Sequence, residues 1–93
     1  MTEVATVFVL HRVKDYGKWR EVYNNAGEMQ AAGGVLEEAA FQAEGDPHNV
    51  LVMHRFASMT EAHTYFENPQ LADAVREAGV DEATVRLEFY EEA

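Results

Sequence analysis

The sequence contains no cysteine and no long uninterrupted run of apolar residues. The first absence excludes a disulfide framework, a thiolate nucleophile and a cysteine-ligated metal site. The second argues against a transmembrane helix, which needs about 18 consecutive apolar residues. Positive charge is also scarce, since seven lysines and arginines face seventeen aspartates and glutamates, for a net charge of −10. Such an acidic surface repels phosphate backbones and anionic lipids, so we expect no nucleic-acid or membrane partner.

The N-terminal segment lacks the pattern of a secretory signal peptide. Glu3 stands where a basic region should be, and no small-residue cleavage site follows the apolar stretch. A cytoplasmic location is therefore expected. Residues 1–93 are predicted to form a single domain, whose small size would give only modest stability as a monomer.

What the sequence does contain is an internal repeat. Residues 7–13, VFVLHRV, return at residues 50–56 as VLVMHRF, and each copy leads into a helix-like segment with aromatic residues at matched positions. A strand followed by a helix and used twice predicts one pseudo-symmetric α+β unit.

The apolar periodicity and the turn residues divide the chain into strands and helices. Four strands are predicted, over residues 4–13, 35–44, 50–56 and 84–90. The first helix is capped by Asp15 and ends at Gly33-Gly34. The second begins with a capping box at Ser58 and restarts at Asn68-Pro69.

The order βαββαβ predicts a ferredoxin-like α+β fold, with a four-stranded antiparallel sheet and the helices on one face. Residues 45–49, GDPHN, are predicted to be the turn between the second and third strands. The other face of the sheet would still be apolar, because it carries Phe8, Leu10, Leu51 and Met53. We therefore expect a homodimer whose two sheets pack together.

Three motifs carry a resemblance to a known superfamily. They are the helix start Asp15-Tyr16-x-x-Trp19, the hairpin Asp46-Pro47-His48-Asn49 and the helix restart Asn68-Pro69-x-Leu71. With the predicted element order, they resemble the dimeric α+β barrel superfamily, which includes antibiotic-biosynthesis monooxygenases, muconolactone isomerase, stress-responsive barrel proteins and haem-degrading monooxygenases. The resemblance covers the whole chain, looks closest to small uncharacterised members, and implies a ligand pocket between helices and sheet.

The second helix departs from the monooxygenase-type pattern. Tyr65 stands about four residues before the Asn-Pro step, where those members usually carry a histidine, and the nearest histidine is His63. The haem-degrading branch relies on a similarly placed histidine with asparagine and tryptophan partners, so the sequence argues against haem degradation. Cofactor-independent oxygenation is implied by the resemblance alone.

His11 and His54 are the first candidate catalytic residues. By strand alternation both face the same side of the sheet as the repeated valines, which we place toward the helices. Because the first and third strands run antiparallel, the two rings should lie toward opposite ends of the sheet and should not share a metal or a proton. Each is interpreted as a general base or a hydrogen-bond donor to substrate, or equally as a strand-end histidine satisfied by backbone.

Tyr65 is the third candidate catalytic residue, and Trp19, Tyr23 and Phe66 are the candidate substrate-binding residues. At helical spacing all four point toward the sheet. They are either core residues, the interpretation favoured for Phe66, or the wall of a pocket. In the pocket, a planar aromatic or polyketide-like ligand would stack on Trp19 and bond to a tyrosine hydroxyl.

The remaining charged candidates are assigned to the surface. Arg12 and Arg55 fall on the face opposite the histidines, where ion pairs with Glu88 or with a partner subunit's acid are expected and anion binding is the alternative. His48, in the predicted turn, and His63, on a helix flank, are predicted to face solvent.

No metal site or cofactor is predicted. No two histidines have i,i+4 spacing, and no phosphate loop, dinucleotide fingerprint or nucleophile elbow occurs. The function hypothesis is a cytoplasmic homodimer that binds a small apolar or aromatic ligand, as a cofactor-independent monooxygenase. The alternatives are a cyclase or isomerase of the same fold, and a non-catalytic binding or assembly module.

Overall fold

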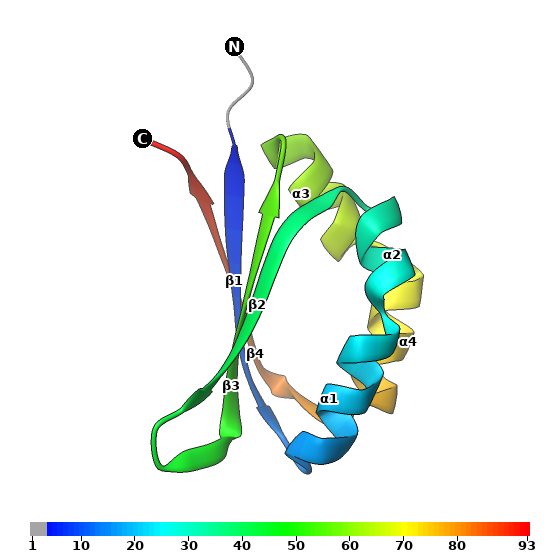
Figure 1. Cartoon of the computed structure of the whole chain (residues 1–93), viewed down its shortest axis with the longest axis vertical. Helices are drawn as coiled ribbons and strands as arrows, with labels where there is room; N and C mark the ends of the chain where they lie inside the picture. The colour runs from blue at the N-terminus through cyan, green and yellow to red at the C-terminus, as the bar shows by residue number, and fades with distance from the viewer. Residues whose placement is uncertain (1–3) are drawn as a thin grey trace.

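The computed structural model describes residues 4–93, and within this range a four-stranded sheet carries helices on one face only (Figure 1). The strands are β1 (Ala5–Val13), β2 (Val35–Ala43), β3 (Asp46–Phe56) and β4 (Val80–Glu91). The helices are α1 (Tyr16–Asn25), α2 (Gly27–Ala32), α3 (Met59–Phe66) and α4 (Pro69–Glu77). The sheet order is β2-β3-β1-β4 and all neighbours are antiparallel, which confirms the predicted ferredoxin-like arrangement. No helix over residues 4–93 is long and apolar enough to cross a membrane.

Both helical segments are divided in two. The single first helix expected from the sequence is wrong, because α1 ends at Asn25 and α2 starts at Gly27. Ala26 joins them outside helical geometry, next to two residues of low helix propensity, Asn25 and Gly27. In the second segment, the break at Asn68-Pro69 is confirmed, and Asn68 Oδ1 accepts a hydrogen bond of 2.9 Å from the N–H of Gln70.

The hairpin between β2 and β3 is shorter than predicted. Residues 45–49 were expected to form the turn, but β3 already begins at Asp46. The connection is Glu44-Gly45, with Gly45 at φ +76°, a conformation that glycine adopts without strain. The predicted turn residues extend the strand instead, because Asn49 pairs with Arg12 of β1.

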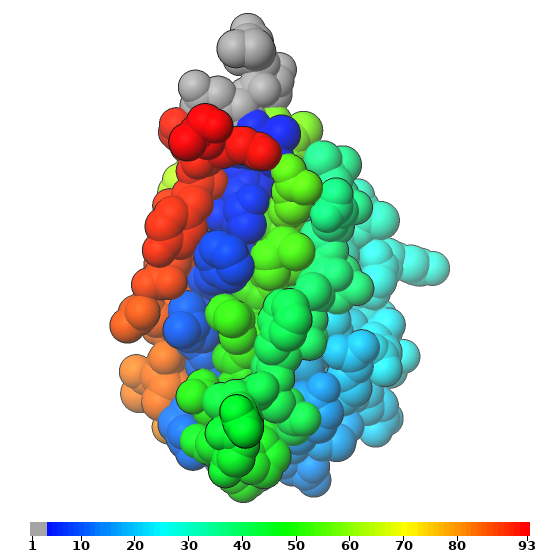
Figure 2. Space-filling model, turned by 60° about the vertical axis from the view of Figure 1, so that its left-hand side comes forward, coloured from blue at the N-terminus to red at the C-terminus, as the bar shows by residue number. Residues whose placement is uncertain are grey.

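The two faces of the sheet have the predicted alternation. Val7 and Val52 are buried on the helix side, whereas Phe8, Leu10, Leu51 and Met53 are half-buried on the other. Figure 2 shows this other face, where β4, β1, β3 and β2 lie side by side with no other element over them. We call the apolar side chains across this face the open-face strip; it consists of Phe8, Leu10, Phe41, Leu51, Met53 and Tyr90.

The arginines of the open face pair differently from the prediction. Arg12 binds Asp46 at 2.9 Å, and Arg55 binds Glu37 at 3.2 Å and Glu92 at 3.0 Å. Glu88 pairs instead with Arg86 at 2.8 Å. The reason is the register: Glu88 lies opposite Phe8, so neither Arg12 nor Arg55 is in its row.

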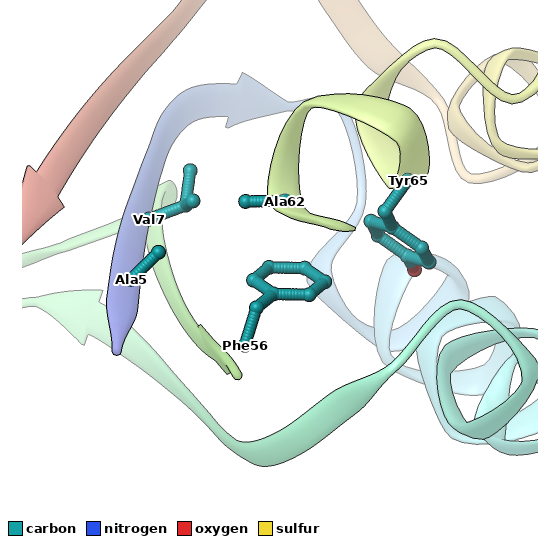
Figure 3. Close-up of a cluster of buried hydrophobic side chains, with 5 residues drawn as sticks. All are labelled: Ala5, Val7, Phe56, Ala62 and Tyr65. Carbon is teal, nitrogen blue, oxygen red and sulfur yellow. The ribbon is translucent and has the colours of Figure 1, made fainter. Parts of the chain in front are cut away.

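Two clusters of buried side chains hold the helices against the sheet. At one end, Ala5 and Val7 of β1 and Phe56 of β3 pack against Ala62 and Tyr65 of α3 (Figure 3). The second cluster, at the other end, consists of Val13, Trp19, Val50, Val52 and Ala78. The space between the two clusters is where the candidate site lies.

Candidate functional site

A cavity of about 360 Å³ lies between the helices and the sheet. It separates the two buried clusters, since Tyr65 of the first and Trp19 of the second both line it. The wall is mostly apolar, with a few polar side chains: His11, Tyr23, Gln30, His54, Tyr65 and Glu82. A concave, mostly apolar space with a few polar groups is typical of small-molecule sites.

All six residues selected from the sequence lie in this wall. His11 comes from β1, His54 from β3, Trp19 and Tyr23 from α1, and Tyr65 and Phe66 from α3. The prediction that both histidines face the helices is confirmed. Their predicted separation is also confirmed, because His54 pairs with Val7 and His11 with Val50 in the ladder of β1 and β3.

Aromatic rings connect the two histidines across the cavity wall. His11 lies 5.7 Å from Trp19, Trp19 stacks on Tyr23 at 4.9 Å and 14°, and Tyr23 lies 6.3 Å from His54, all between ring centroids. Tyr16 extends the stack on the other side of Trp19, at 5.6 Å. Helical spacing explains the stack, since residues three or four apart lie on one side of α1.

The hydroxyl of Tyr23 joins His54 to a carboxylate. It donates to Oε1 of Glu38, on β2, and lies 3.4 Å from Nε2 of His54. Because a phenol has one proton and a carboxylate only accepts, Nε2 must be the donor to the tyrosine oxygen. His54 is therefore held as the Nε2–H tautomer, which leaves Nδ1 unprotonated in the neutral ring.

Two polar residues of the site were not predicted from the sequence: Glu38, which binds Tyr23, and Gln30, whose buried amide lines the cavity. Glu38 lies directly opposite His54 in the ladder of β2 and β3, which brings it to the helix side. The register of the β2–β3 hairpin would have revealed Glu38. The predicted turn at residues 45–49 gives a different register, because β3 already begins at Asp46.

Nδ1 of His11 and Nδ1 of His54 are both buried with no hydrogen-bond partner among residues 4–93. The side chains of His11 and His54 are only 6% and 4% exposed. Neither ring is therefore fully satisfied by the protein, which disfavours the purely structural interpretation.

The strand-end histidine satisfied by backbone is His48. Its Nδ1 lies 2.8 Å from the carbonyl oxygen of Val13. The predicted turn position is wrong, because His48 lies within β3, whereas its predicted exposure is confirmed. His63 is exposed as expected, and its ring stacks on Phe89 at 4.3 Å.

Burial sets the protonation of the wall. It lowers the pKa of His54 to about 4, although the negative charge of Glu38 opposes the shift. Burial also lowers the pKa of His11, and a hydrogen bond to the backbone of Val9 partly opposes this shift. It raises the pKa of Tyr65 to about 12, and burial together with the bond to Glu38 raises the pKa of Tyr23. At neutral pH the wall therefore offers neutral imidazoles and protonated phenols.

The cavity reaches the surface between α4 and β4, where its lining residues become exposed: Ala72, Glu82, Val85 and Leu87. A β-bulge shapes this mouth. Leu10 faces Arg86 but Arg12 faces Asp81, so β4 carries extra residues between these two pairs. Thr84 fixes the bulge by accepting from the N–H of Arg12 at 2.9 Å and donating to the carbonyl of Asp81 at 2.6 Å.

The architecture closely matches that of solved structures across nearly the whole chain. SnoaB, a cofactor-independent oxygenase from Streptomyces nogalater, matches with a TM-score of 0.70 at 10% identity, over 100% of this chain and 93% of that one. A protein from Caulobacter crescentus CB15, named as an antibiotic biosynthesis monooxygenase, matches with a TM-score of 0.80 at 12% identity, over 99% of this chain and 92% of that one. A similarly named protein from Bordetella bronchiseptica matches with a TM-score of 0.80 at 7% identity, over 98% of each chain.

This chain shares the fold of these structures, an α+β arrangement with a four-stranded antiparallel sheet. No protein-family model matches the sequence, and no curated protein matches it either. At identities of 7–12% the structural likeness establishes the fold alone, and the site is defined by the chain's own residues. Among residues 4–93 no group of three or more histidines and acids is placed to hold a metal ion.

Proposed function

We propose that this α+β barrel works as a cytoplasmic homodimer and binds a small, planar, mostly apolar aromatic molecule between helices and sheet. The observation that carries the proposal is the 360 Å³ cavity, whose wall brings together the stacked rings of α1 and two neutral histidines. Its volume is within the range of about 300–1,000 Å³ for ligand pockets. Polar side chains in the wall, among them Tyr65 and Gln30, support an occupant that also carries polar atoms.

The shape of the wall supports an aromatic ligand. Tyr16, Trp19 and Tyr23 stack at interplanar angles of 27° and 14°. Because Trp19 has a ring stacked on each side, the row presents ring edges to the cavity, and an aromatic ligand packs on ring edges through edge-to-face contacts. Tyr65 and Gln30 add neutral hydrogen-bonding groups for the oxygens of the ligand.

The reaction we propose is cofactor-independent monooxygenation of an electron-rich substrate. His11 is the favoured base, because Nε2 of His54 is already engaged by Tyr23. A neutral imidazole takes a proton from an acidic CH₂ group, and the hydroxyl of Tyr65 donates a hydrogen bond to the enolate oxygen that forms. The carbanion then reduces dioxygen: CH₂ and O₂ give C=O and H₂O. The activity printed for SnoaB is of this type.

The homodimer is proposed from the open-face strip. Phe41 and Tyr90 are 51% and 50% exposed, and the strip crosses all four strands. A continuous apolar face of this kind usually marks an interaction surface. A second copy offers a strip of the same chemistry, and an isologous contact between two identical sheets closes without leaving a further face.

Oxygen uptake with anthrone, a tricyclic compound with an acidic CH₂ group, tests the enzymatic part. We expect oxygen consumption matched by formation of the quinone, and a loss of about 10²-fold or more in His11→Gln. The control is His63→Gln, an exposed histidine outside the cavity. Binding without oxygen uptake would remove the oxygenase and leave the cyclase or isomerase and the non-catalytic binding module as alternatives. Equal rates in both variants would remove His11 from the mechanism.

A further inference from the structure

The wall of the cavity carries no positive charge, and this limits what it can bind. Over residues 4–93, its lining contains one formally charged side chain, the carboxylate of Glu82 at the mouth. The two histidines do not change this, because burial lowers the pKa of His11 and of His54 and keeps both rings neutral at pH 7.

The arginines of the described part of the chain are placed away from the wall. Four of them form ion pairs with acids that do not line the cavity: Arg12, Arg55, Arg76 and Arg86. The fifth, Arg20, lies over the ring of Tyr23 at 5.4 Å and is not part of the lining. The hydroxyl of the same ring donates to the carboxylate of Glu38, which adds a negative charge close to the wall. The whole chain has a net charge of −10.

A carboxylate that enters this cavity would lose its water without gaining a cation in return. Unpaired charges are the groups that proteins bury least readily, whereas neutral hydroxyl and carbonyl groups need only a hydrogen-bond partner. Gln30 and Tyr65 can supply such partners.

We infer that the ligand of this cavity is an uncharged aromatic molecule, such as a phenol or a polycyclic ketone, and that the site excludes aromatic carboxylates. This inference rests on the proposed function and narrows its substrate class. It assigns a specificity role to Glu82, which repels anions at the entrance. The bulge of β4 lies between Asp81 and Arg86 and therefore includes Glu82, which lines the cavity.

Two probes of the same shape and different charge test the inference: 1-naphthamide, which is uncharged, and 1-naphthoate. Calorimetric titration of the purified protein at neutral pH should show the amide binding at least about tenfold more tightly than the acid. In Glu82→Lys, affinity for naphthoate should rise by about fivefold or more, while affinity for naphthamide stays within about twofold.

Glu44→Lys is the matched control, because Glu44 is exposed at the β2–β3 turn, outside the cavity lining, and the charge change is identical. It should leave the ratio of the two affinities unchanged. Equal binding of both probes by the unaltered protein, or an equal gain for naphthoate in both lysine variants, would overturn the inference while the cavity remains a ligand site. If neither naphthamide nor 1-naphthol binds, the proposed function itself fails.

Discussion

Nε2 of His54 lies 3.4 Å from the hydroxyl oxygen of Tyr23, whose proton is donated to Glu38. The contact brings together β3, α1 and β2, three segments that are far apart in the sequence. It links a buried imidazole in the cavity wall to an exposed carboxylate at the edge of the sheet. Because the carboxylate determines where the phenol proton lies, Glu38 fixes the tautomer of His54 without touching the ring.

Glu38→Gln should lower the pKa of the Tyr23 phenol. The bond to Glu38 and its negative charge both disfavour the phenolate, and the substitution removes them. Burial, the larger cause of the raised pKa, remains, so the pKa should stay above that of a free phenol. Ultraviolet titration of the phenolate, with Tyr23→Phe to identify the residue, measures the change.

Glu37→Gln is the control for that titration. Glu37 is the neighbouring residue on β2, but it lies opposite Arg55 and pairs with it on the open face. The Tyr23 transition should not move in this variant. A pKa that is the same in Glu38→Gln and in the unaltered protein would show that the hydrogen bond contributes nothing to it.

The stability of the fold should depend on pH through His54. Its pKa is about 4 when folded, against 6.5 for an unperturbed histidine, so the unfolded chain binds the extra proton. The stability of the fold with a neutral His54 ring is fully present above pH 6.5 and is lost as the pH falls toward 4. The free energy of unfolding should drop by about 2–3 kcal/mol over this interval, with a further loss from His11.

Urea unfolding at several pH values measures this loss. The slope should become shallower in His54→Gln, which cannot take up the proton. His63→Gln should keep the original slope, because His63 is exposed. An unchanged slope in His54→Gln would assign the acid sensitivity to other groups.

The sequence was enough to place the histidines but not the carboxylate behind them. Strand alternation has a period of two, so the buried valines of β1 and β3 place His11 and His54 on the same face with no knowledge of the register. Glu38 is different, because its face depends on how β2 pairs with β3. That ladder contains register shifts between Val35 and Glu37 and at Gln42, and a slip of one residue would move Glu38 to the open face.

The resemblance implied a pocket between helices and sheet, but the residues alone could not show that this space is open. The aromatic residues of α1 and α3 were correctly directed at the sheet, but helical periodicity is the same for a filled core and for a pocket wall. Two irregular backbone segments border the space: Ala26, between α1 and α2, and the bulge of β4 near Glu82. Asn25 and Gly27 mark a weak point in the first helix, but the bulge has no distinctive sequence pattern.

Leu51→Glu should separate the proposed dimer. Leu51 lies in the middle of the open-face strip, opposite Leu10 on β1 and Phe41 on β2. Two like charges brought together in an apolar interface would be desolvated without partners, so association should weaken by about 10²-fold or more. Sedimentation should show the unaltered protein at twice the chain mass of 10.5 kDa and the variant at the chain mass.

Gln70→Glu is the control for the dimer, since Gln70 is exposed on α4, on the helix side of the molecule. It adds the same charge and should leave the dimer intact. A monomer in the unaltered protein would contradict the proposal directly, whatever the variants do.

Gly33→Ala should disturb Tyr65. A Cβ atom at Gly33 would overlap Cδ1 of the Tyr65 ring, and the ring is only 3% exposed within the first buried cluster. The backbone of Gly33 has φ −83°, so alanine adopts it without strain, and the clash with the ring is the main effect. Overpacking of this kind costs about 1–3 kcal/mol of unfolding free energy, and the displaced ring should also weaken naphthol binding. Gly27→Ala is the matched substitution, because nothing lies within 4 Å of its added Cβ atom, and it should leave binding unchanged and raise stability by up to about 1 kcal/mol. Equal melting temperatures and equal naphthol affinities in the two variants would mean that Tyr65 moves freely and is not a fixed part of the cavity wall.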